Sequence, residues 1–400
     1  MRVDMRGIAA VLTCLAAGAM VGCSHAAPRV SRSWDPKAAA AYLDYREGWW
    51  MQWTGAARDH GTFCISCHTA LPYALSRPAL RPALAEQGPT EIERSLLENV
   101  TKRVRLWKNV GPYYSGQGYD SGQRYDHESA ESRGTEAVLN ALILASHDAQ
   151  GGALSDDTRA AFNNMWALQQ PRGENRGSWP WLQFDQEPWE ARDSPYYGAA
   201  LAAIAVGTAP GNYAATPEIQ ENLASLRLFL NRERTSQSII NHVFLLLASS
   251  KLPGLLTPQE QQAIVREIMS KQQRDGGWRL ASITCKWNGW SLRSFVNMWL
   301  REDGTPMSGK SDGVATSLIT LALQEVGVAR NNAQLHRGLS WLMNNQNAEG
   351  SWPASSVNKR RHISSDTGRF MSDAATAYAV LALTEGQRTT NSVASASHPK

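Results

Sequence analysis

Cysteine and charge of a single sign are both scarce in this sequence. Its 400 residues include 5 cysteines, and 40 basic residues nearly balance 36 acidic ones, for a formal net charge of +4. So few cysteines exclude a disulfide-rich secreted scaffold. So small an excess of charge, without a lysine- and arginine-rich tract, gives no basis for nucleic-acid binding.

Long apolar runs are also missing beyond the first two dozen residues. The run from Ile8 to Met20 follows Arg2 and Arg6. It is shorter than the ~20 residues that a membrane span needs, so residues 1–22 are predicted to be an export signal, with a transmembrane anchor as the alternative. Met20-Val21-Gly22-Cys23 resembles the bacterial lipobox. The resemblance implies a lipid on Cys23 and a periplasm-facing protein of the bacterial cell envelope, attached to a membrane through that lipid alone.

The rest of the chain has the composition of a folded protein, with 42% apolar and 19% charged residues. Residues 23–36 are predicted to be a tether and residues 387–400 a disordered tail. Four prolines, at 72, 78, 82 and 89, predict short pieces between two N-terminal helices. Apolar residues then recur every three and four positions, and little of the chain has a strand pattern. An all-α protein is therefore expected, with helices at 37–53, 90–107, 135–146, 156–169, 195–206, 216–230, 237–249, 257–272, 312–326, 332–345 and 374–384.

Three of the expected helices end in a glutamine that is followed by Gly-x-Trp. Glycine allows the turn, tryptophan packs back over the helix end, and the glutamine amide bonds exposed backbone there. The segments are Gln169 to Trp179, Gln272 to Trp278 and Gln346 to Trp352. They resemble the QW repeat of squalene-hopene cyclases and their relatives. This resemblance implies an (α/α) toroid over residues 111–386, and an unrelated helical repeat is the alternative.

The sequence Cys64-Ile65-Ser66-Cys67-His68 carries the sharpest chemical signal. Two thiols at this spacing can add to the two vinyl groups of haem, and the adjacent imidazole can reach the iron. The motif resembles the haem attachment site of c-type cytochromes. The resemblance implies haem c held by Cys64 and Cys67, with His68 as the proximal ligand, in a helical segment over residues 37–110. The alternatives are a disulfide or half of a zinc site, but zinc needs four ligands and no second CxxC exists.

The sixth iron ligand cannot be identified from the sequence, because the first methionine after the motif is the distant Met165. This departure from small cytochromes predicts that the haem segment needs the toroid to complete its pocket. A five-coordinate iron is the alternative. The weak candidates for the sixth ligand are His60, Met51, His127 and Met371.

The catalytic residues of the resembling enzymes have no counterparts here. Squalene-hopene cyclases protonate an alkene with the middle aspartate of Asp-x-Asp-Asp, and this motif is missing. Cys285 lacks the aspartate and histidine partners of a prenyltransferase zinc site. Acids at or near helix starts form a possible cavity wall, with helix capping and core packing as the alternative: Glu136, Asp193, Asp312 and Asp373. The basic cluster from Asn358 to His362 is expected to be a solvated loop.

Three functions remain open. The first is electron transfer or redox service to a partner protein. The second is a haem-assisted enzyme or sensor, with an apolar or terpenoid small molecule in the toroid. The third is a non-catalytic interaction scaffold. All three share the haem.

Overall fold

A computed structural model describes residues 33–114, 124–184, 186–284, 310–357, 361–362 and 364–396, without the side chains of residues 124–128 and 386–396. The described residues belong to one compact unit. The expected signal peptide, the lipidation residue Cys23 and Cys285 lie outside the described residues. Within the described ranges, no helix combines the length and apolar character that a membrane span requires.

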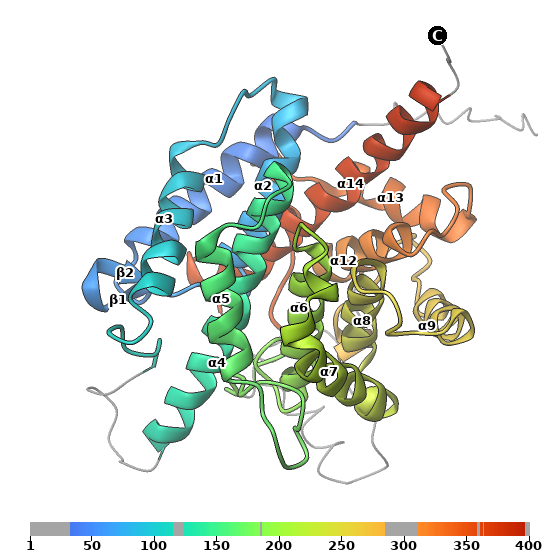
Figure 1. The fold of residues 1–400 in the computed structure, drawn as a ribbon. Helices are drawn as coiled ribbons and strands as arrows, with labels where there is room; N and C mark the ends of the chain where they lie inside the picture. Colours follow the sequence, from blue (N-terminus) through green and yellow to red (C-terminus); the bar gives the residue numbers. More distant parts are fainter. Residues whose placement is uncertain are drawn as a thin grey trace, which may run out of the picture. The chain divides into compact units, whose positions relative to one another are not determined.

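The chain is predominantly helical, as the sequence predicts (Figure 1). The one paired sheet of the described ranges joins two-residue strands, β1 (Ala57–Arg58) and β2 (Thr62–Phe63), around a 3-10 turn at Asp59–Gly61. The helices are α1 (Pro36–Gln52), α2 (Ala70–Leu84), α3 (Glu91–Arg105), α4 (Arg124–Gly151), α5 (Asp156–Ala167), α6 (Ser194–Thr208), α7 (Gln220–Glu233), α8 (Ile239–Lys251), α9 (Pro258–Ser270), α10 (Ala281–Thr284), α12 (Gly313–Glu325), α13 (Ala333–Asn345) and α14 (Phe370–Ala396).

Six helices form a closed series of contacts. α2 packs on α4, α4 on α6, α6 on α8, α8 on α12, α12 on α14, and α14 returns to α2. Several of these helices are buried on all sides; α12, for example, is buried from Gly313 to Leu323. A helix that is apolar all round belongs inside a protein. The six therefore form the core of the helical unit.

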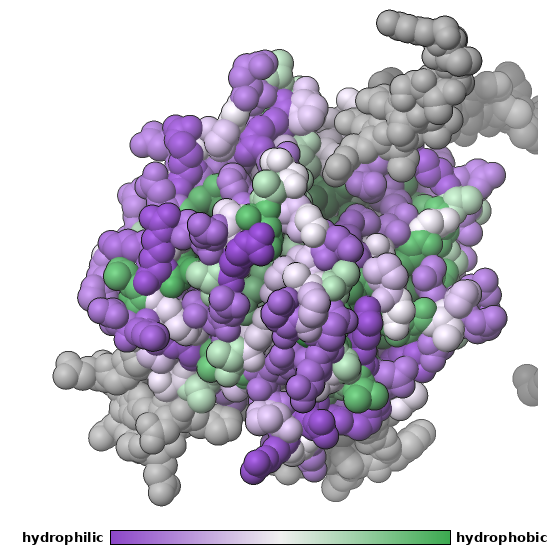
Figure 2. Space-filling view, viewed as in Figure 1, coloured by the Kyte–Doolittle hydropathy of each residue, from purple (hydrophilic) through white to green (hydrophobic). Residues whose placement is uncertain are grey.

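A second set of helices packs on the first. α5 contacts α4, α7 contacts α6, α9 contacts α8, and α13 contacts both α12 and α14. These helices are amphipathic; α9 buries only Ile264 and Ile268. Figure 2 accordingly shows a face that is mostly hydrophilic, with small separate apolar areas. α1 also packs on the series, against α14 and α2.

The three Gln…Gly-x-Trp segments hold the ends of this second set of helices. Each glutamine Nε2 donates to the carbonyl of the following glycine and to a backbone carbonyl of another segment. The pairs of acceptors are Gly177 and Asn222 for Gln169, Gly276 and Gln334 for Gln272, and Gly350 and Asp35 for Gln346. Each indole is fully buried and donates back to its own helix: Trp179 to Met165, Trp278 to Ile268 and Trp352 to Leu342.

The last of these segments binds the start of the described chain. Gln346 accepts a hydrogen bond from the Asp35 backbone N–H at 2.6 Å and donates to the Asp35 carbonyl at 2.9 Å. A Cβ on Gly350 would lie 2.2 Å from the carbonyl oxygen of Ala38, so only glycine fits there. The segment after α13 is therefore held against the start of α1.

Three expectations about elements need correction. α2 is continuous with Pro78 and Pro82 inside it, although the sequence predicts short pieces. Pro72 lies in its first turn, where a missing backbone N–H costs no intrahelical hydrogen bond. Packing against α1, α4 and α14 outweighs the two interior prolines. α14 continues to Ala396, past the expected start of a disordered tail at residue 387, because extending a packed helix needs no new nucleus. The boundary expected at residues 110 and 111 falls inside one compact unit, because helices from both sides of it pack together.

Candidate functional site

The Cys64–His68 motif lies between β2 and the start of α2. The backbone N–H of Cys64 donates to the Ala56 carbonyl at 2.9 Å, and Trp50 Nε1 donates to the Cys64 carbonyl at 2.8 Å. Ser66 Oγ accepts from the N–H groups of Thr69 and Ala70 at 3.2 and 3.1 Å. Ser66 thus satisfies free amides at the first turn of α2 and fixes the turn that carries His68.

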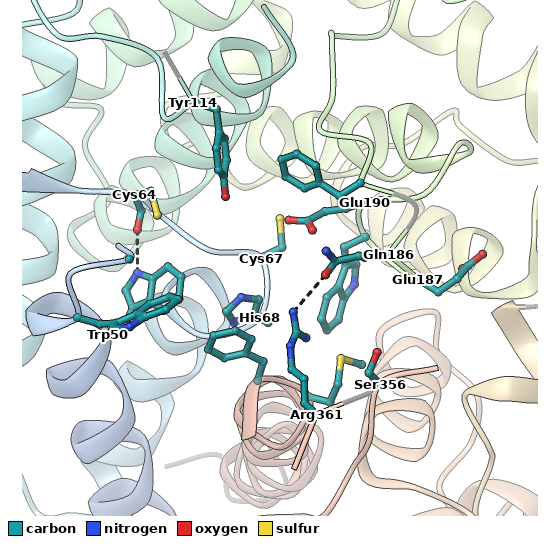
Figure 3. Close-up of a pocket in the computed structure, with 16 residues that line it drawn as sticks. Trp50, Cys64, Cys67, His68, Tyr114, Gln186, Glu187, Glu190, Ser356 and Arg361 are labelled. Carbon is teal, nitrogen blue, oxygen red and sulfur yellow. Dashed lines mark hydrogen bonds between the residues drawn. The ribbon is translucent and has the colours of Figure 1, made fainter. Parts of the chain in front are cut away.

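A cavity of about 300 Å³ opens beside the motif (Figure 3). Cys64, Cys67 and His68 all line it. Its other walls come from the end of α1 and the turn after it, the segment between α3 and α4, the segment 184–190, the loop before α14 and the first turn of α14. The residues are Trp50, Trp53, Gly55, Tyr114, Phe184, Gln186, Glu187, Trp189, Glu190, Ser356, Arg361, Phe370 and Met371. Residues far along the chain thus complete the cavity beside the motif.

Both motif cysteines are free and buried. The disulfide alternative is therefore not formed in this structure. Burial raises the pKa of the Cys64 thiol to about 11 and that of Cys67 well above its ordinary value. Both side chains are therefore neutral thiols at neutral pH.

The hydrogen bonds of His68 determine which ring nitrogen carries its proton. Nδ1 lies 2.8 Å from Thr69 Oγ1, and Thr69 Oγ1 donates its own hydrogen to Asp373 Oδ2 at 2.8 Å. A hydroxyl has one hydrogen, so Thr69 must accept from Nδ1–H. Burial, together with the charges of Arg361 and Arg46, holds the pKa of His68 well below its ordinary value. His68 is therefore a neutral imidazole with a bare lone pair on Nε2.

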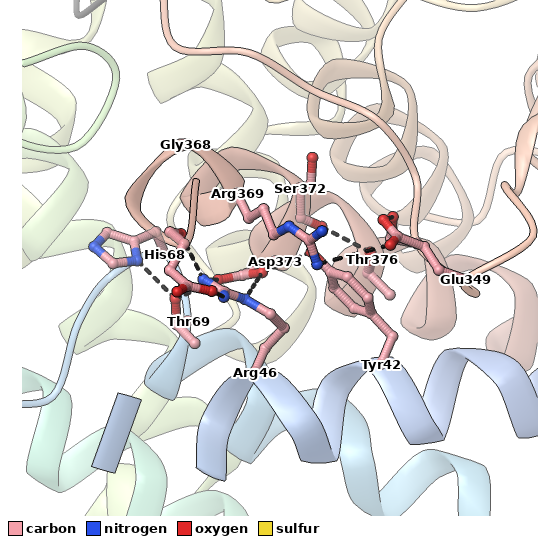
Figure 4. A network of polar contacts seen from close by, with 12 residues as sticks. Tyr42, Arg46, His68, Thr69, Glu349, Gly368, Arg369, Ser372, Asp373 and Thr376 are labelled. Atoms are coloured by element: carbon pink, nitrogen blue, oxygen red, sulfur yellow. Dashed lines mark hydrogen bonds and ion pairs between the residues drawn. The ribbon is translucent and has the colours of Figure 1, made fainter. Parts of the chain in front are cut away.

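Aromatic rings hold the imidazole from two sides. Phe370 stacks on it, with ring centroids 3.8 Å apart, and Trp50 meets it edge-on at 5.1 Å. In Figure 4 the second ring nitrogen points away from the polar network. Two thiols and an unprotonated imidazole nitrogen on one cavity are the donors that a c-type haem needs, so the residues present fit that group.

The candidates for a sixth ligand lie in different places. Met371 is buried and lines the same cavity as the motif. His60 is exposed on the turn between β1 and β2, and Met51 is half-buried in the last turn of α1; neither lines the cavity. His127 falls within α4, in a stretch whose side chains lie outside the described residues.

None of the four acids expected as a cavity wall lines this cavity. Glu136 is fully buried and pairs with Arg103, and Asp193 accepts from Ser238 Oγ at 3.0 Å. Asp312 caps α12 by accepting from the Ala315 N–H at 3.0 Å. Burial raises the pKa of Asp312 to about 6, so it remains ionised at neutral pH. Asp312 thus caps its helix, as the capping alternative expects, whereas Glu136 and Asp193 bond side chains that the sequence does not reveal.

Asp373 is the most heavily bonded of the four (Figure 4). Its carboxylate accepts from Arg46 Nε at 2.8 Å and Nη2 at 3.1 Å, from Tyr42 at 2.8 Å and from Thr69 at 2.8 Å. Burial raises the pKa of Asp373, whereas Arg46 and the two hydroxyls favour the ionised form. The residue lies behind His68 rather than in the cavity.

Sequence reasoning missed two charged residues of the cavity. Arg361, expected in a solvated loop, is half-buried there and donates to Gln186 Oε1 at 3.2 Å. Glu190 faces the motif from the segment 184–190, and Figure 3 places its carboxylate beside Cys67. The described residues of that segment have no regular secondary structure beyond an isolated bridge between Gln186 and Glu190, so no periodic pattern marks it.

A scan against models of known protein families and a search of curated proteins both found no match to this chain.

Proposed function

We propose that this protein carries one covalently attached c-type haem and serves in electron transfer to a partner protein. Cys64 and Cys67 would form the thioether bonds, and His68 Nε2 would bind the iron. A bound haem of this kind exchanges single electrons between ferrous and ferric iron. The observation that carries the proposal is the meeting of both free thiols and the bare Nε2 on one cavity.

The rest of the cavity supports electron transfer over chemistry on a substrate. Met371 lies in the same cavity, and a thioether there is able to close the iron's second axial position. Trp50, Trp189 and Phe370 are buried and apolar, so they limit the access of water to the iron. A redox partner protein is part of this proposal.

For the scaffold, we propose an (α/α) toroid. The closed contact series of α2, α4, α6, α8, α12 and α14 would be its inner ring. The second set of helices would be its outer ring, which the bonds between Gln346 and Asp35 help to close. In this arrangement the haem segment belongs to the rings themselves, because it supplies α1, α2 and α3.

The haem proposal is tested by staining for haem after denaturation. Wild-type protein, produced in cells with a c-type maturation system, should keep the stain on a denaturing gel. The double variant C64A/C67A should lose it. Cys285→Ala, which removes a cysteine outside the motif, is the matched control and should keep it. Wild-type protein without stain under these conditions contradicts the proposal.

A second candidate function is an enzyme or ligand sensor. It is favoured by the charged wall of the cavity, where burial lowers the pKa of Arg361 and the charge of Glu190 opposes part of this effect. Carbon monoxide distinguishes the two functions, because it binds ferrous iron only at an open or easily opened position. Wild-type protein that does not bind carbon monoxide, while Met371→Ala does, supports electron transfer. Ready binding by the wild type supports the enzyme or sensor.

We also propose export and lipid attachment at Cys23. Mass spectrometry of the mature N-terminus tests this. A mature chain that begins with an acylated Cys23 supports both steps. A chain that begins downstream of Cys23, or that lacks the acyl mass, contradicts the lipid anchor and leaves export intact.

A further inference from the structure

A chain of three side chains leads from the cavity to a buried ion pair. His68 Nδ1–H donates to Thr69, and Thr69 donates to Asp373, each at 2.8 Å. His68 and Thr69 are neighbours in the turn before α2, whereas Asp373 lies in the first turn of α14. The chain of hydrogen bonds therefore depends on the packing of α14 against α2.

The far end of this chain is held firmly. Asp373 and Arg46 are each about 1% exposed, and the guanidinium meets the carboxylate with two N–H groups. Arg46 also donates to Asp366 Oδ1 at 2.9 Å and to the Asp366 carbonyl at 2.7 Å. The hydroxyl of Tyr42 gives Asp373 another donor. Four donors on one carboxylate leave it as an acceptor only, and this fixes the direction of every bond in the chain.

Partners of a ligand histidine fix its ring and change its basicity. A carboxylate that accepts from the far N–H of an imidazole makes the other nitrogen a stronger electron donor. Here the carboxylate of Asp373 acts through the Thr69 hydroxyl. Donation to Asp373 polarises this hydroxyl, so its oxygen is a better acceptor for the Nδ1–H of His68. A stronger donor stabilises ferric iron relative to ferrous iron and lowers the reduction potential.

We infer that Thr69 and Asp373 are positioning residues for His68: they hold its proton on Nδ1, direct Nε2 into the cavity and increase the electron donation of Nε2. The orientation of the ring is a property of the chain alone. The effect on the iron rests on the haem function proposed above. Neither residue touches the cavity, so each acts only through His68.

The first test uses the haem-free protein. Nitrogen-15 NMR correlation spectra of the His68 ring separate a protonated nitrogen from a bare one. Wild type and Thr69→Ser, which keeps the hydroxyl, should show a protonated Nδ1 and a bare Nε2. Thr69→Val should lose this fixed arrangement. Thr101→Val, a hydroxyl removed from α3 outside the chain of bonds, is the matched control and should match wild type.

The second test uses the haem-loaded protein. Thr69→Val should shift the reduction potential to a more positive value. In the Met371→Ala background, where the ferrous iron would be five-coordinate, it should also lower the iron–histidine stretching frequency in the resonance Raman spectrum. Thr69→Ser, which keeps the hydroxyl, should leave the reduction potential and the stretching frequency close to their values with threonine. A purely structural role for Thr69 would move neither quantity in a folded protein.

The outcomes separate this inference from the haem proposal. A wild-type His68 that carries its proton on Nε2 overturns the inference and leaves covalent haem attachment intact. Unchanged potential and stretching frequency in Thr69→Val also overturn it. A wild-type chain that takes up no haem overturns the proposed function, while the NMR measurement still decides the orientation of the ring.

Discussion

The polar groups around His68 and those at the three Gln…Gly-x-Trp segments are both buried, but they use different partners. Around His68, side chains bond side chains, as Thr69 and Arg46 do with Asp373. At the helix ends, glutamine amides and indole N–H groups mainly bond backbone carbonyls, as Trp352 does with Leu342. Backbone carbonyls are present whatever the side chains are, so the acceptors at the helix ends depend on the fold alone.

This difference indicates that the Gln…Gly-x-Trp segments stabilise the helical scaffold. The polar groups around His68 instead set the orientation and basicity of its imidazole. Changes at the helix ends should lower the free energy of unfolding and leave haem properties unchanged. Changes around His68 should alter haem properties at a smaller cost in stability. Variants in the two regions therefore test whether the two roles are separable.

The largest loss of stability is expected for Trp352→Ala. Its indole is fully buried, and truncating such a side chain costs about 3–5 kcal/mol. Urea unfolding of the haem-loaded protein measures this loss, and the reduction potential should stay at the wild-type value. Leu228→Ala, at a side chain 65% exposed, is the control and should change stability by less than about 0.5 kcal/mol. A folded Trp352→Ala protein with a shifted reduction potential would contradict the separation of the two roles.

A pair of glycines separates backbone strain from steric exclusion at a helix end. Gly350 and Gly152 both have positive φ, at 93° and 74°. A Cβ on Gly350 meets the Ala38 carbonyl oxygen at 2.2 Å, whereas a Cβ on Gly152 meets nothing within 4 Å. Gly152→Ala should cost about 1–2 kcal/mol from backbone strain, and Gly350→Ala clearly more. Equal shifts of the thermal midpoint would show that the contact with Ala38 is unimportant.

Glu47 gives the site region a pH dependence of its own. It is fully buried, and neither carboxylate oxygen has a hydrogen-bond partner among the described residues. Burial and the charge of Asp373 raise its pKa from 4.5 to about 8. Below pH 4.5 both folded and unfolded states hold the proton. As the pH rises toward 8, only the unfolded state ionises, so stability falls by up to about 1.4 kcal/mol per pH unit.

Replacing Glu47 by glutamine should remove this decline. The free energy of unfolding of Glu47→Gln minus that of wild type should therefore grow between pH 5 and pH 8 and level off above that range. Glu221→Gln, at an exposed position on α7, is the control and should show no such trend. A flat difference for Glu47→Gln would mean that Glu47 is ionised in the folded protein.

A smaller loss of stability than that of Trp352→Ala is expected for Thr69→Val. The variant removes the hydrogen bonds of Thr69 to His68 and to Asp373. Asp373 keeps three other donors, but the buried Nδ1–H of His68 loses its acceptor, so the cost should be about 2 kcal/mol. Its reduction potential should nevertheless differ from that of wild type, unlike that of Trp352→Ala. A loss of stability in Thr69→Val as large as in Trp352→Ala would show that Thr69 also stabilises the fold. The roles of the two regions would then not be separable.

The helices and their ends could be predicted well from the sequence, because they depend on local patterns. The apolar period gives most helices to within a few residues, and Asp312 caps α12 as its position suggests. The bonds of Gln346 and Trp352 also follow from what these side chains can do beside a helix end. α2 is the exception, since its packing outweighs the two interior prolines.

The candidate site was only partly predictable, because its second half comes from distant residues. Cys64, Cys67 and His68 form a local motif. The partner of Asp373 is Arg46, 327 positions away, and no spacing rule connects the two. A carboxylate at a helix start looks the same in sequence whether it caps the helix, lines a cavity or binds a buried arginine.

Mass spectrometry of the denatured protein tests the central claim most directly. The chain should be produced with a c-type maturation system, unfolded and digested. The account predicts that the peptide containing Cys64 to His68 carries the full mass of one haem bound through both cysteines. A peptide with two free thiols, or with a bond between Cys64 and Cys67, would contradict it.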